Sequence, residues 1–262
     1  MGKSLFLLTQ KDLAKLSVIM LLAVIFFGLT GLIIMLFFQW ITLRSYAADA
    51  ADKHGISQVS ASRLGGLAIF ISWVGLMLAG YYNGYLGGKS GGPVGPYWID
   101  WFSVGFCAFL GLAEDLRNNM LSPRFRLYAE LAIFAITIGF WPVLIPTNLG
   151  FLGIDALMAV PVVGWFLTVV FCVGFINAVN MSDGANGLMS GIMTIAYSLF
   201  YLNTGEFVYA AMMTACALFT LFNVISGRLF LGDTGAYGLG ASVAISALYL
   251  FSQDVFSAAF LA

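Results

Sequence analysis

A short polar segment, FINAVNMSDGANG at residues 175–187, holds the residues of this chain whose types and spacing are best suited to chemistry. Asn177, Asn180, Asp183 and Asn186 lie three residues apart, which on an α-helix keeps neighbours on one side with a drift of about 60° per step. The segment joins two apolar runs, so these side chains lie where one membrane helix ends and another begins. Lipid penalises polar groups, and four together therefore favour a functional site over the alternative of helix capping and turn formation.

Composition places the chain among polytopic membrane proteins. Of its 262 residues, 61% are hydrophobic and 9% are charged, whereas soluble domains carry about 25% charged residues. The net charge is −1 and the basic residues form no stripe, which argues against nucleic-acid binding. The three cysteines lie within apolar runs without metal-ligand spacing, so we interpret them as small buried hydrophobic residues.

Apolar runs of membrane-spanning length predict an all-α polytopic membrane protein that forms a single domain over residues 1–262. The last apolar run stops at residue 262, which predicts the start of a ninth span and a C-terminally truncated chain. The eight predicted spans cover residues 16–40, 65–82, 99–113, 127–145, 157–176, 188–202, 207–225 and 239–251.

Acidic residues gather in the loops that follow the first, third, fifth and seventh spans. The interiors of the spans are almost free of ionisable groups, and Glu130, one turn into its span, is the nearest exception. A transporter needs charges near the middle of the bilayer, whereas an enzyme that acts on a lipid headgroup needs them at the membrane surface. The distribution favours the enzyme over a transporter or flippase without chemistry, and a truncated inactive homologue is the other alternative. The acidic residues concerned are Glu114, Asp115, Asp183 and Asp233.

The same four loops hold seven of the eleven basic residues, so the positive-inside rule assigns them to the cytoplasm. The adjacent Glu114 and Asp115 would repel each other unless a cation lay beside them. Mg²⁺ takes oxygen ligands, usually one or two carboxylates with substrate phosphates, and arginines bind the remaining phosphate charge. These groups suit metal-assisted phosphoryl or phosphoglycosyl transfer. The arginines considered for that charge are Arg63, Arg117, Arg124 and Arg126, although basic loops beside a membrane also follow from the positive-inside rule alone.

Four motifs occur in the order and loop context of a known family: RLGG at residues 63–66, GLAEDL at 111–116, NAVNMSDGANGL at 177–188 and FLGDTGAYGLG at 230–240. On these motifs the chain resembles the polyprenyl-phosphate N-acetylhexosamine-1-phosphate transferases, the MraY/WecA-like glycosyltransferases of family 4 type, and in particular their bacterial branch with GLAED and GDxGAY signatures. The resemblance covers nearly the whole chain.

The resemblance implies a reaction at the cytoplasmic face of the bacterial inner membrane. A UDP-N-acetylhexosamine gives its sugar-1-phosphate to undecaprenyl phosphate, Mg²⁺ is required and UMP is released. The product starts a lipid-linked glycan of the cell surface, such as a cell-wall polymer or the O-antigen of lipopolysaccharide. Dimers occur among members of that family, so a homodimer is one expected state. The sugar and the pathway are not encoded in these motifs.

The resemblance also implies roles for individual residues. Asp233 matches the metal-binding aspartate and Asn180 a second metal ligand, while Asp115, with Glu114 before it, matches the acidic pair assigned to catalysis. His54 lies in the first cytoplasmic loop, and an ordinary loop histidine is an equal alternative for it. The residues expected to bind the nucleotide sugar are Asn186, Asp183, Asn177, Arg126, Arg63 and His54.

Two departures from the family pattern stand out. Glu114 replaces the aspartate of many relatives, a change that lengthens the side chain by one methylene. Relatives also continue with further spans and with a histidine-bearing loop that helps to bind the donor phosphates. The resemblance therefore strengthens the expectation of a C-terminal truncation.

Overall fold

The computed structural model of the chain describes residues 10–43, 48–49, 61–84, 97–117 and 120–257. Helices make up most of the described part, and five of them are long and apolar enough to cross a membrane. The prediction of an all-α polytopic membrane fold is confirmed, while the single domain over residues 1–262 stays a prediction. The elements are α1 (Gln10–Thr42), β1 (Ala48–Asp49), β2 (Ala61–Ser62), α2 (Gly65–Tyr82), α3 (Tyr97–Leu116), α4 (Pro123–Phe140), η2 (Pro142–Leu144), α5 (Leu152–Met158), α6 (Pro161–Ser182), α7 (Leu188–Thr204), α8 (Phe207–Ser226) and α9 (Gly232–Ser252).

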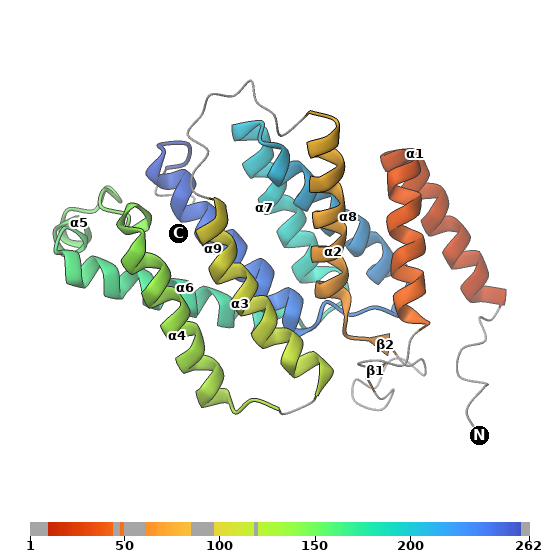
Figure 1. Cartoon of the computed structure of the whole chain (residues 1–262), viewed down its shortest axis with the longest axis horizontal. Helices are drawn as coiled ribbons and strands as arrows, with labels where there is room; N and C mark the ends of the chain where they lie inside the picture. The colour runs from red at the N-terminus through yellow and green to blue at the C-terminus, as the bar shows by residue number, and fades with distance from the viewer. Residues whose placement is uncertain (1–9, 44–47, 50–60, 85–96, 118–119, 258–262) are drawn as a thin grey trace.

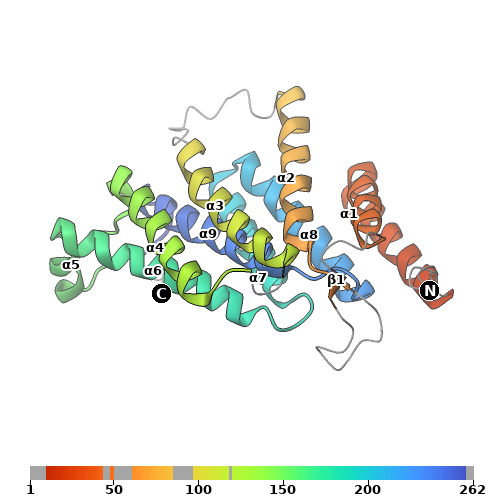
Figure 2. The same cartoon turned by 60° about the horizontal axis from the view of Figure 1, so that its bottom comes forward.

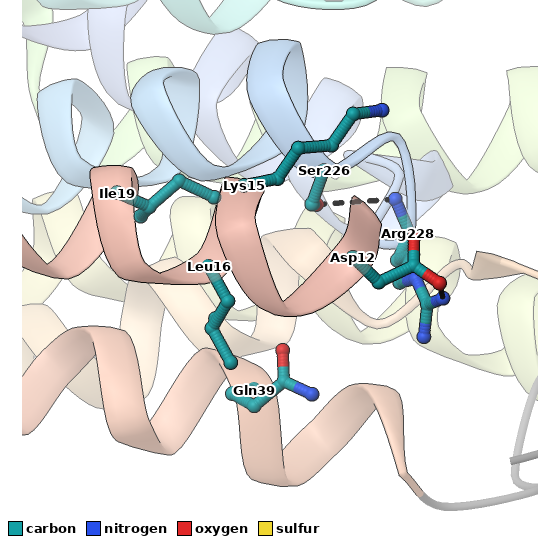
Figure 3. Close-up of a pocket in the computed structure, with 7 residues that line it drawn as sticks. All are labelled: Asp12, Lys15, Leu16, Ile19, Gln39, Ser226 and Arg228. Atoms are coloured by element: carbon teal, nitrogen blue, oxygen red, sulfur yellow. Dashed lines mark hydrogen bonds and ion pairs between the residues drawn. The ribbon is translucent and has the colours of Figure 1, made fainter. Parts of the chain in front are cut away.

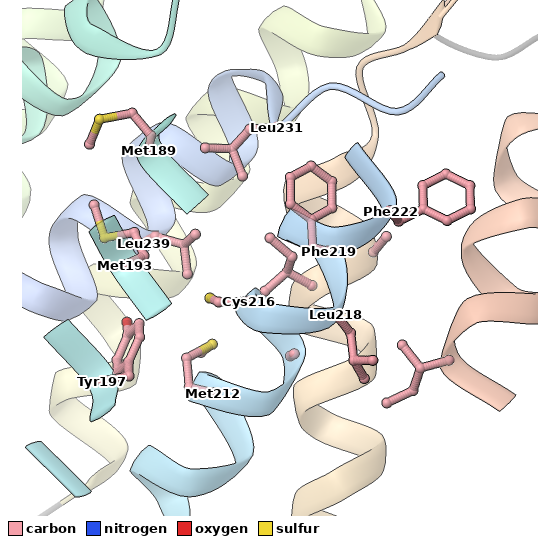
Figure 4. Close-up of a cluster of buried hydrophobic side chains, with 14 of the residues drawn as sticks. Met189, Met193, Tyr197, Met212, Cys216, Leu218, Phe219, Phe222, Leu231 and Leu239 are labelled. Carbon is pink, nitrogen blue, oxygen red and sulfur yellow. The ribbon is translucent and has the colours of Figure 1, made fainter. Parts of the chain in front are cut away.

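Helix α9 lies inside the bundle, with α3 and α6 packed against it (Figures 1 and 2). It contributes to both hydrophobic clusters of the described residues. The first joins α9 to α1, α2, α7 and α8, and the second joins it to α3, α4 and α6. Figure 4 shows part of the first cluster, where Leu239 of α9 lies near Met193 of α7 and Cys216 of α8. One helix therefore connects the two halves of the core.

Helix α1 is the outermost long helix and turns back on itself. Gly28 has φ 61° and ψ −151°, a backbone conformation that is almost restricted to glycine, so the span predicted over residues 16–40 is interrupted there. The two arms of the helix lie side by side (Figure 1). Figure 3 shows that Leu16 and Gln39, one from each arm, line a small pocket together with Arg228, which follows α8.

The start of α9 also differs from the prediction. The helix begins at Gly232, whereas the span was predicted from residue 239, because the GDTG sequence has the composition of a turn. A two-residue strand pair, β1 with β2, precedes α2. Beyond it, the main chain at Ser62 exchanges hydrogen bonds with Arg228 and Phe230, so the entries to α2 and α9 lie side by side.

Glycines allow this close approach. A Cβ on Gly65 would lie 2.2 Å from the Phe230 carbonyl oxygen, and one on Gly66 would lie 2.0 Å from the Gly235 nitrogen. Real Cβ atoms do not approach that closely, so the RLGG and GDTG motifs are explained by the contact between their two backbones. The contact brings the first and fourth polar loops together.

Candidate active site

The four loops predicted to share one membrane face meet at the first turn of α9. Arg63, before α2, donates from Nη2 to the Asp115 carbonyl oxygen at 3.3 Å. The Asp115 side chain, near the end of α3, accepts hydrogen bonds from the first turn of α9. Asn180 of α6 and Arg126 of α4 both contact Asp233. The contacts of Arg126 and Asp115 with the start of α9 thus join residues that lie more than 100 positions apart, while the roles expected for these residues stay predictions.

Asp115 caps α9 from another helix. Its Oδ1 accepts from the Asp233 N–H at 2.9 Å, and its Oδ2 accepts from the Thr234 N–H at 2.8 Å and from the Thr234 hydroxyl at 2.6 Å. Leu231, the residue that precedes the helix, supplies no side-chain cap, so this carboxylate satisfies donors that α9 would otherwise leave unpaired. Its charge also complements the positive end of the helix dipole. Asp115 is fully buried, and this geometry fixes the position of Asp233.

Two glycines allow the close contact between α3 and the start of α9. Gly232 has φ 70°, and a Cβ on it would lie 2.7 Å from Asp115 Oδ2. A Cβ on Gly111 would lie 2.2 Å from the Asp233 carbonyl oxygen. The glycines of GLAED and GDTG therefore let α3 and the start of α9 meet at backbone distance, as the glycines of RLGG do for α2.

Asp233, in the first turn of α9, contacts side chains of two other helices in this cluster. Its side chain is 28% exposed, and its Oδ1 accepts from Asn180 Nδ2 at 2.9 Å. Its Oδ2 lies 3.4 Å from Arg126 Nη1, which also donates to the Tyr237 hydroxyl at 3.1 Å. Sequence reasoning assigned no role to Tyr237. The signal was present, because a residue four positions after Asp233 lies on the same side of a helix.

Asp183 follows the end of α6 and is electrostatically coupled to the other two aspartates. Burial, and after it the charges of Asp233 and Asp115, together raise the pKa of Asp183 to about 6. Three carboxylates thus lie close enough to influence one another at one end of the bundle. A bound cation would relieve this repulsion.

A second polar pair lies beside Asn180 and Asp233. Asn177 donates to Glu130 Oε2 at 2.6 Å and to the Val173 carbonyl oxygen at 2.8 Å. Glu130 is 1% exposed, and its Oε1 has no hydrogen-bond partner among the residues that the structure describes. Asn177 was expected to bind the nucleotide sugar, but its side-chain NH₂ group donates to two acceptors within the protein. Sequence reasoning assigned no role to Glu130.

The remaining predicted residues have separate surroundings. Glu114 is nearly buried, and its Oε2 accepts from the Leu121 N–H at 3.1 Å, which ties the loop after α3 to its helix. Asn186 is exposed in the turn before α7 and lies beside Gly227, at the end of α8. Arg124 is exposed on α4. His54 lies outside the described residues.

The oxygen atoms around Asp233 fit a Mg²⁺ ion that takes only a few ligands from the protein. Among the described residues, no three His, Cys, Asp or Glu side chains are grouped so that they could hold a metal ion alone. Mg²⁺ in proteins is commonly held by one or two carboxylates, with waters and substrate phosphates completing its shell. Asp233, with the Asn180 amide oxygen and the nearby Asp183, meets that need, and Arg63 and Arg126 are available for phosphate charge.

Comparison with known proteins identifies bacterial relatives. The chain is 28% identical over 231 residues to a Bacillus subtilis protein named as a probable undecaprenyl-phosphate N-acetylglucosaminyl 1-phosphate transferase, with 84% of this chain and 60% of that protein covered. It is 26% identical to the phospho-N-acetylmuramoyl-pentapeptide-transferase of Listeria welshimeri, with 72% and 61% covered. It is 32% identical to the protein of the same name from Synechococcus, with 67% and 52% covered. The chain thus spans between one half and two thirds of the length of these relatives.

A family-level match covers most of the site. Residues 97–251, from α3 almost to the end of α9, match the family described as glycosyl transferase family 4. This range contains the aspartates, asparagines and Arg126 of the cluster around the first turn of α9, and Arg63 lies outside it. The resemblance to polyprenyl-phosphate hexosamine-1-phosphate transferases is confirmed, and the chain belongs to glycosyl transferase family 4.

Proposed function

We propose that this protein transfers N-acetylhexosamine-1-phosphate from a UDP-sugar to undecaprenyl phosphate at the cytoplasmic membrane face and releases UMP. The name of the Bacillus subtilis relative, which contains both undecaprenyl phosphate and N-acetylglucosaminyl 1-phosphate, supports this proposal, and the name of the Listeria relative supports transfer of a phosphorylated amino sugar. The observation that carries the proposal is the meeting of Asp233, Asn180 and Asp183 with Arg63 and Arg126 at one end of a membrane-helix bundle. In the proposed reaction a soluble nucleotide sugar and a membrane lipid meet at this end of the bundle.

In this reaction a phosphate oxygen of the lipid attacks the phosphorus that carries the sugar, and the bond to the UMP oxygen breaks. Negative charge on the phosphoryl oxygens must be stabilised throughout, and preorganised positive groups provide most of the catalysis in such transfers. Arg126 and Arg63 are placed to contact the diphosphate. Asp183, Asn186 and His54 are proposed to contact the nucleotide.

Mg²⁺, when bound, would neutralise phosphate charge and orient the diphosphate. Asp233 and Asn180 are the proposed ligands. Asp115 is too deeply buried to touch a substrate in this geometry, and its three hydrogen bonds are all to the start of α9. We therefore assign it, and Glu114 by its bond to Leu121, the task of positioning the residues that contact substrate.

The test measures UMP release by the purified protein with Mg²⁺, UDP-N-acetylglucosamine and undecaprenyl phosphate. Asp233→Asn keeps the side-chain size but removes the ligand charge, and we expect activity to fall by at least about 100-fold. Asp254→Asn is the matched control, because Asp254 is exposed just beyond the opposite end of α9. Equal activity in the two variants would disprove the site.

The same preparation discriminates the rival functions. A transporter or flippase would move a lipid-linked sugar across a vesicle membrane without producing UMP. A binding protein without chemistry would retain UDP-sugar yet release no UMP in the presence of both substrates. The position of the carboxylates at a helix end, away from the middle of the spans, favours the transferase.

A further inference from the structure

Two acid–amide pairs lie next to each other between α4, α6 and α9. Asn180 donates to Asp233, and Asn177, three residues earlier on α6, donates to Glu130 of α4. Arg126 lies four residues before Glu130, a spacing that places two side chains on the same side of a helix. The charge of Arg126 also acts on Glu130. The guanidinium is therefore within the influence of both carboxylates but makes its ion pair with only one.

The ion pair of Arg126 with Asp233 has the geometry of a weak contact. One nitrogen, Nη1, lies 3.4 Å from Asp233 Oδ2 and also serves the Tyr237 hydroxyl. Strong pairs of arginine with carboxylate are shorter, about 2.7–2.9 Å, and often use two nitrogens. Both side chains are partly exposed, at 22% and 28%. Little free energy therefore opposes the separation of Arg126 from Asp233.

Glu130 is much less exposed than Arg126 and Asp233. It is almost completely buried, its Oε2 is held by Asn177, and its Oε1 has no partner within the described parts of the chain. A buried polar atom without a hydrogen bond is costly, and such atoms call for a partner that another state supplies. The nearest cation along the same face of α4 is Arg126.

We propose that Glu130 is a second partner of the Arg126 guanidinium, which moves from Asp233 to Glu130 Oε1 when a divalent cation binds Asp233. The proposal rests on the proposed metal site. A divalent ion at Asp233 would compete with the guanidinium for Oδ2, since both are positive. Glu130 lies one turn further along α4, a rise of about 6 Å that a flexible arginine side chain can accommodate. Arg126 therefore competes with the metal for Asp233. Glu130 is a positioning residue, because it holds the guanidinium away from Asp233.

The experiment measures Mn²⁺ binding to the purified full chain in detergent by electron paramagnetic resonance, without substrate. Glu130→Gln retains the shape of the side chain but not its charge, so Arg126 stays at Asp233. We expect Mn²⁺ affinity to fall about fivefold. Arg126→Gln removes the competitor, and we expect affinity to rise about fivefold. Lys11→Gln, which removes an exposed cation from α1, is the control and should leave affinity unchanged.

The double variant separates this device from a simple charge effect. If Glu130 acts only through its field on the metal, Glu130→Gln weakens binding equally with and without Arg126. If Glu130 acts by receiving the guanidinium, the effect of Glu130→Gln disappears in the Arg126→Gln background. Equal effects in both backgrounds would overturn the proposal, as would an unchanged affinity in Arg126→Gln alone.

A wrong assignment of the metal site would give a different pattern of Mn²⁺ binding. Asp233→Asn should abolish Mn²⁺ binding whatever residue stands at position 130. If Mn²⁺ binds equally to Asp233→Asn and to the unmodified protein, the assignment of the metal site is wrong. The proposed movement of Arg126 is then wrong as well. If binding depends on Asp233 but not on Glu130, the metal site stands and only the exchange is wrong.

Discussion

Helices α1 and α9 show opposite relations between hydropathy and burial. Among the five candidate spans, α1 has the highest mean hydropathy and α9 the lowest. Yet 83% of the most apolar window of α9 is buried, against 28% of that of α1. In water the more apolar helix would be expected at the centre. In a membrane the lipid is as apolar as a leucine side chain, so hydropathy does not decide which helix is central.

Small residues explain the central place of α9. Its sequence, GDTGAYGLGASVAISALYLFS, is rich in glycine, alanine and serine, which let neighbouring backbones approach closely. A Cβ on Gly238 would lie 2.6 Å from the ring of Phe70 on α2 and 2.9 Å from Ala108 on α3. Helix α1 instead presents large side chains outward, among them Phe26 and Leu29. Close backbone packing therefore identifies the helix that carries the site.

The largest loss of stability is expected where a glycine of α3 contacts the start of α9. We expect Gly111→Ala to lower the free energy of unfolding by about 3 kcal/mol or more, because its Cβ would lie 2.2 Å from the Asp233 carbonyl oxygen. Gly105→Ala on the same helix has open space around its Cβ and should change stability by less than about 0.5 kcal/mol. Thermal unfolding in detergent, followed by size-exclusion chromatography, measures both. Similar melting temperatures would refute backbone contact between α3 and α9.

A leucine on each helix gives the next largest contrast. Leu239 of α9 is fully buried, and Leu239→Ala should cost about 2 kcal/mol because it leaves a cavity. Leu29 of α1 is 71% exposed, and Leu29→Ala should cost less than about 0.5 kcal/mol. The same unfolding assay compares them. A larger loss at Leu29 would mean that α1 is packed against a surface that these contacts do not include.

The sequence predicted the helices well because the membrane imposes one requirement on each of them. Apolar runs of sufficient length must be helical, since lipid offers no hydrogen bonds to the backbone. Alternation of the loops between two faces then placed Asp115, Asn180 and Asp233 on one side. Their contact could be expected from that argument, although their distances could not.

Other features depended on partners that lie far away in the sequence. Helix α9 starts at Gly232 because Asp115, 118 residues earlier than Asp233, caps it, and no local pattern carries that information. The turn of α1 at Gly28 was equally hard to predict, because a glycine within an apolar run is also compatible with a straight helix. The pairing of Glu130 with Asn177 required knowledge of how α4 crosses α6.

Asp183, which follows the end of α6, gives a smaller, pH-dependent effect. The pKa of Asp183, beside Asp233, is raised from 3.8 to about 6, so the folded state binds this proton more tightly than the unfolded state does. Stability should therefore fall as pH rises from about 3.8 to about 6 and should not change further on this account above that range. We expect a difference of about 1 kcal/mol, once solvent screening of this partly exposed group is allowed for.

Asp183→Asn isolates that contribution, because all other carboxyl groups titrate in both proteins. The difference in melting temperature between variant and parent should grow as pH rises through the same range, with the variant the more stable at pH 7. A pH-independent difference would show that neither burial nor the charges of Asp233 and Asp115 raise the pKa of Asp183.

The first turn of α1 offers the smallest effect. Asp12 pairs with Arg228 at 2.6 Å, with side chains 19% and 15% exposed (Figure 3). Asp12→Asn should lower stability by about 0.5 kcal/mol, and added salt should reduce the difference. Lys15→Gln, at the rim of the same pocket, is the control. UMP release should be unchanged in both, because the main chain of the loop that contains Arg228 is held by Ser62 independently of α1. A strong loss of activity in Asp12→Asn alone would instead mean that α1 controls the entry to α9, and the two helices could no longer be treated as periphery and centre.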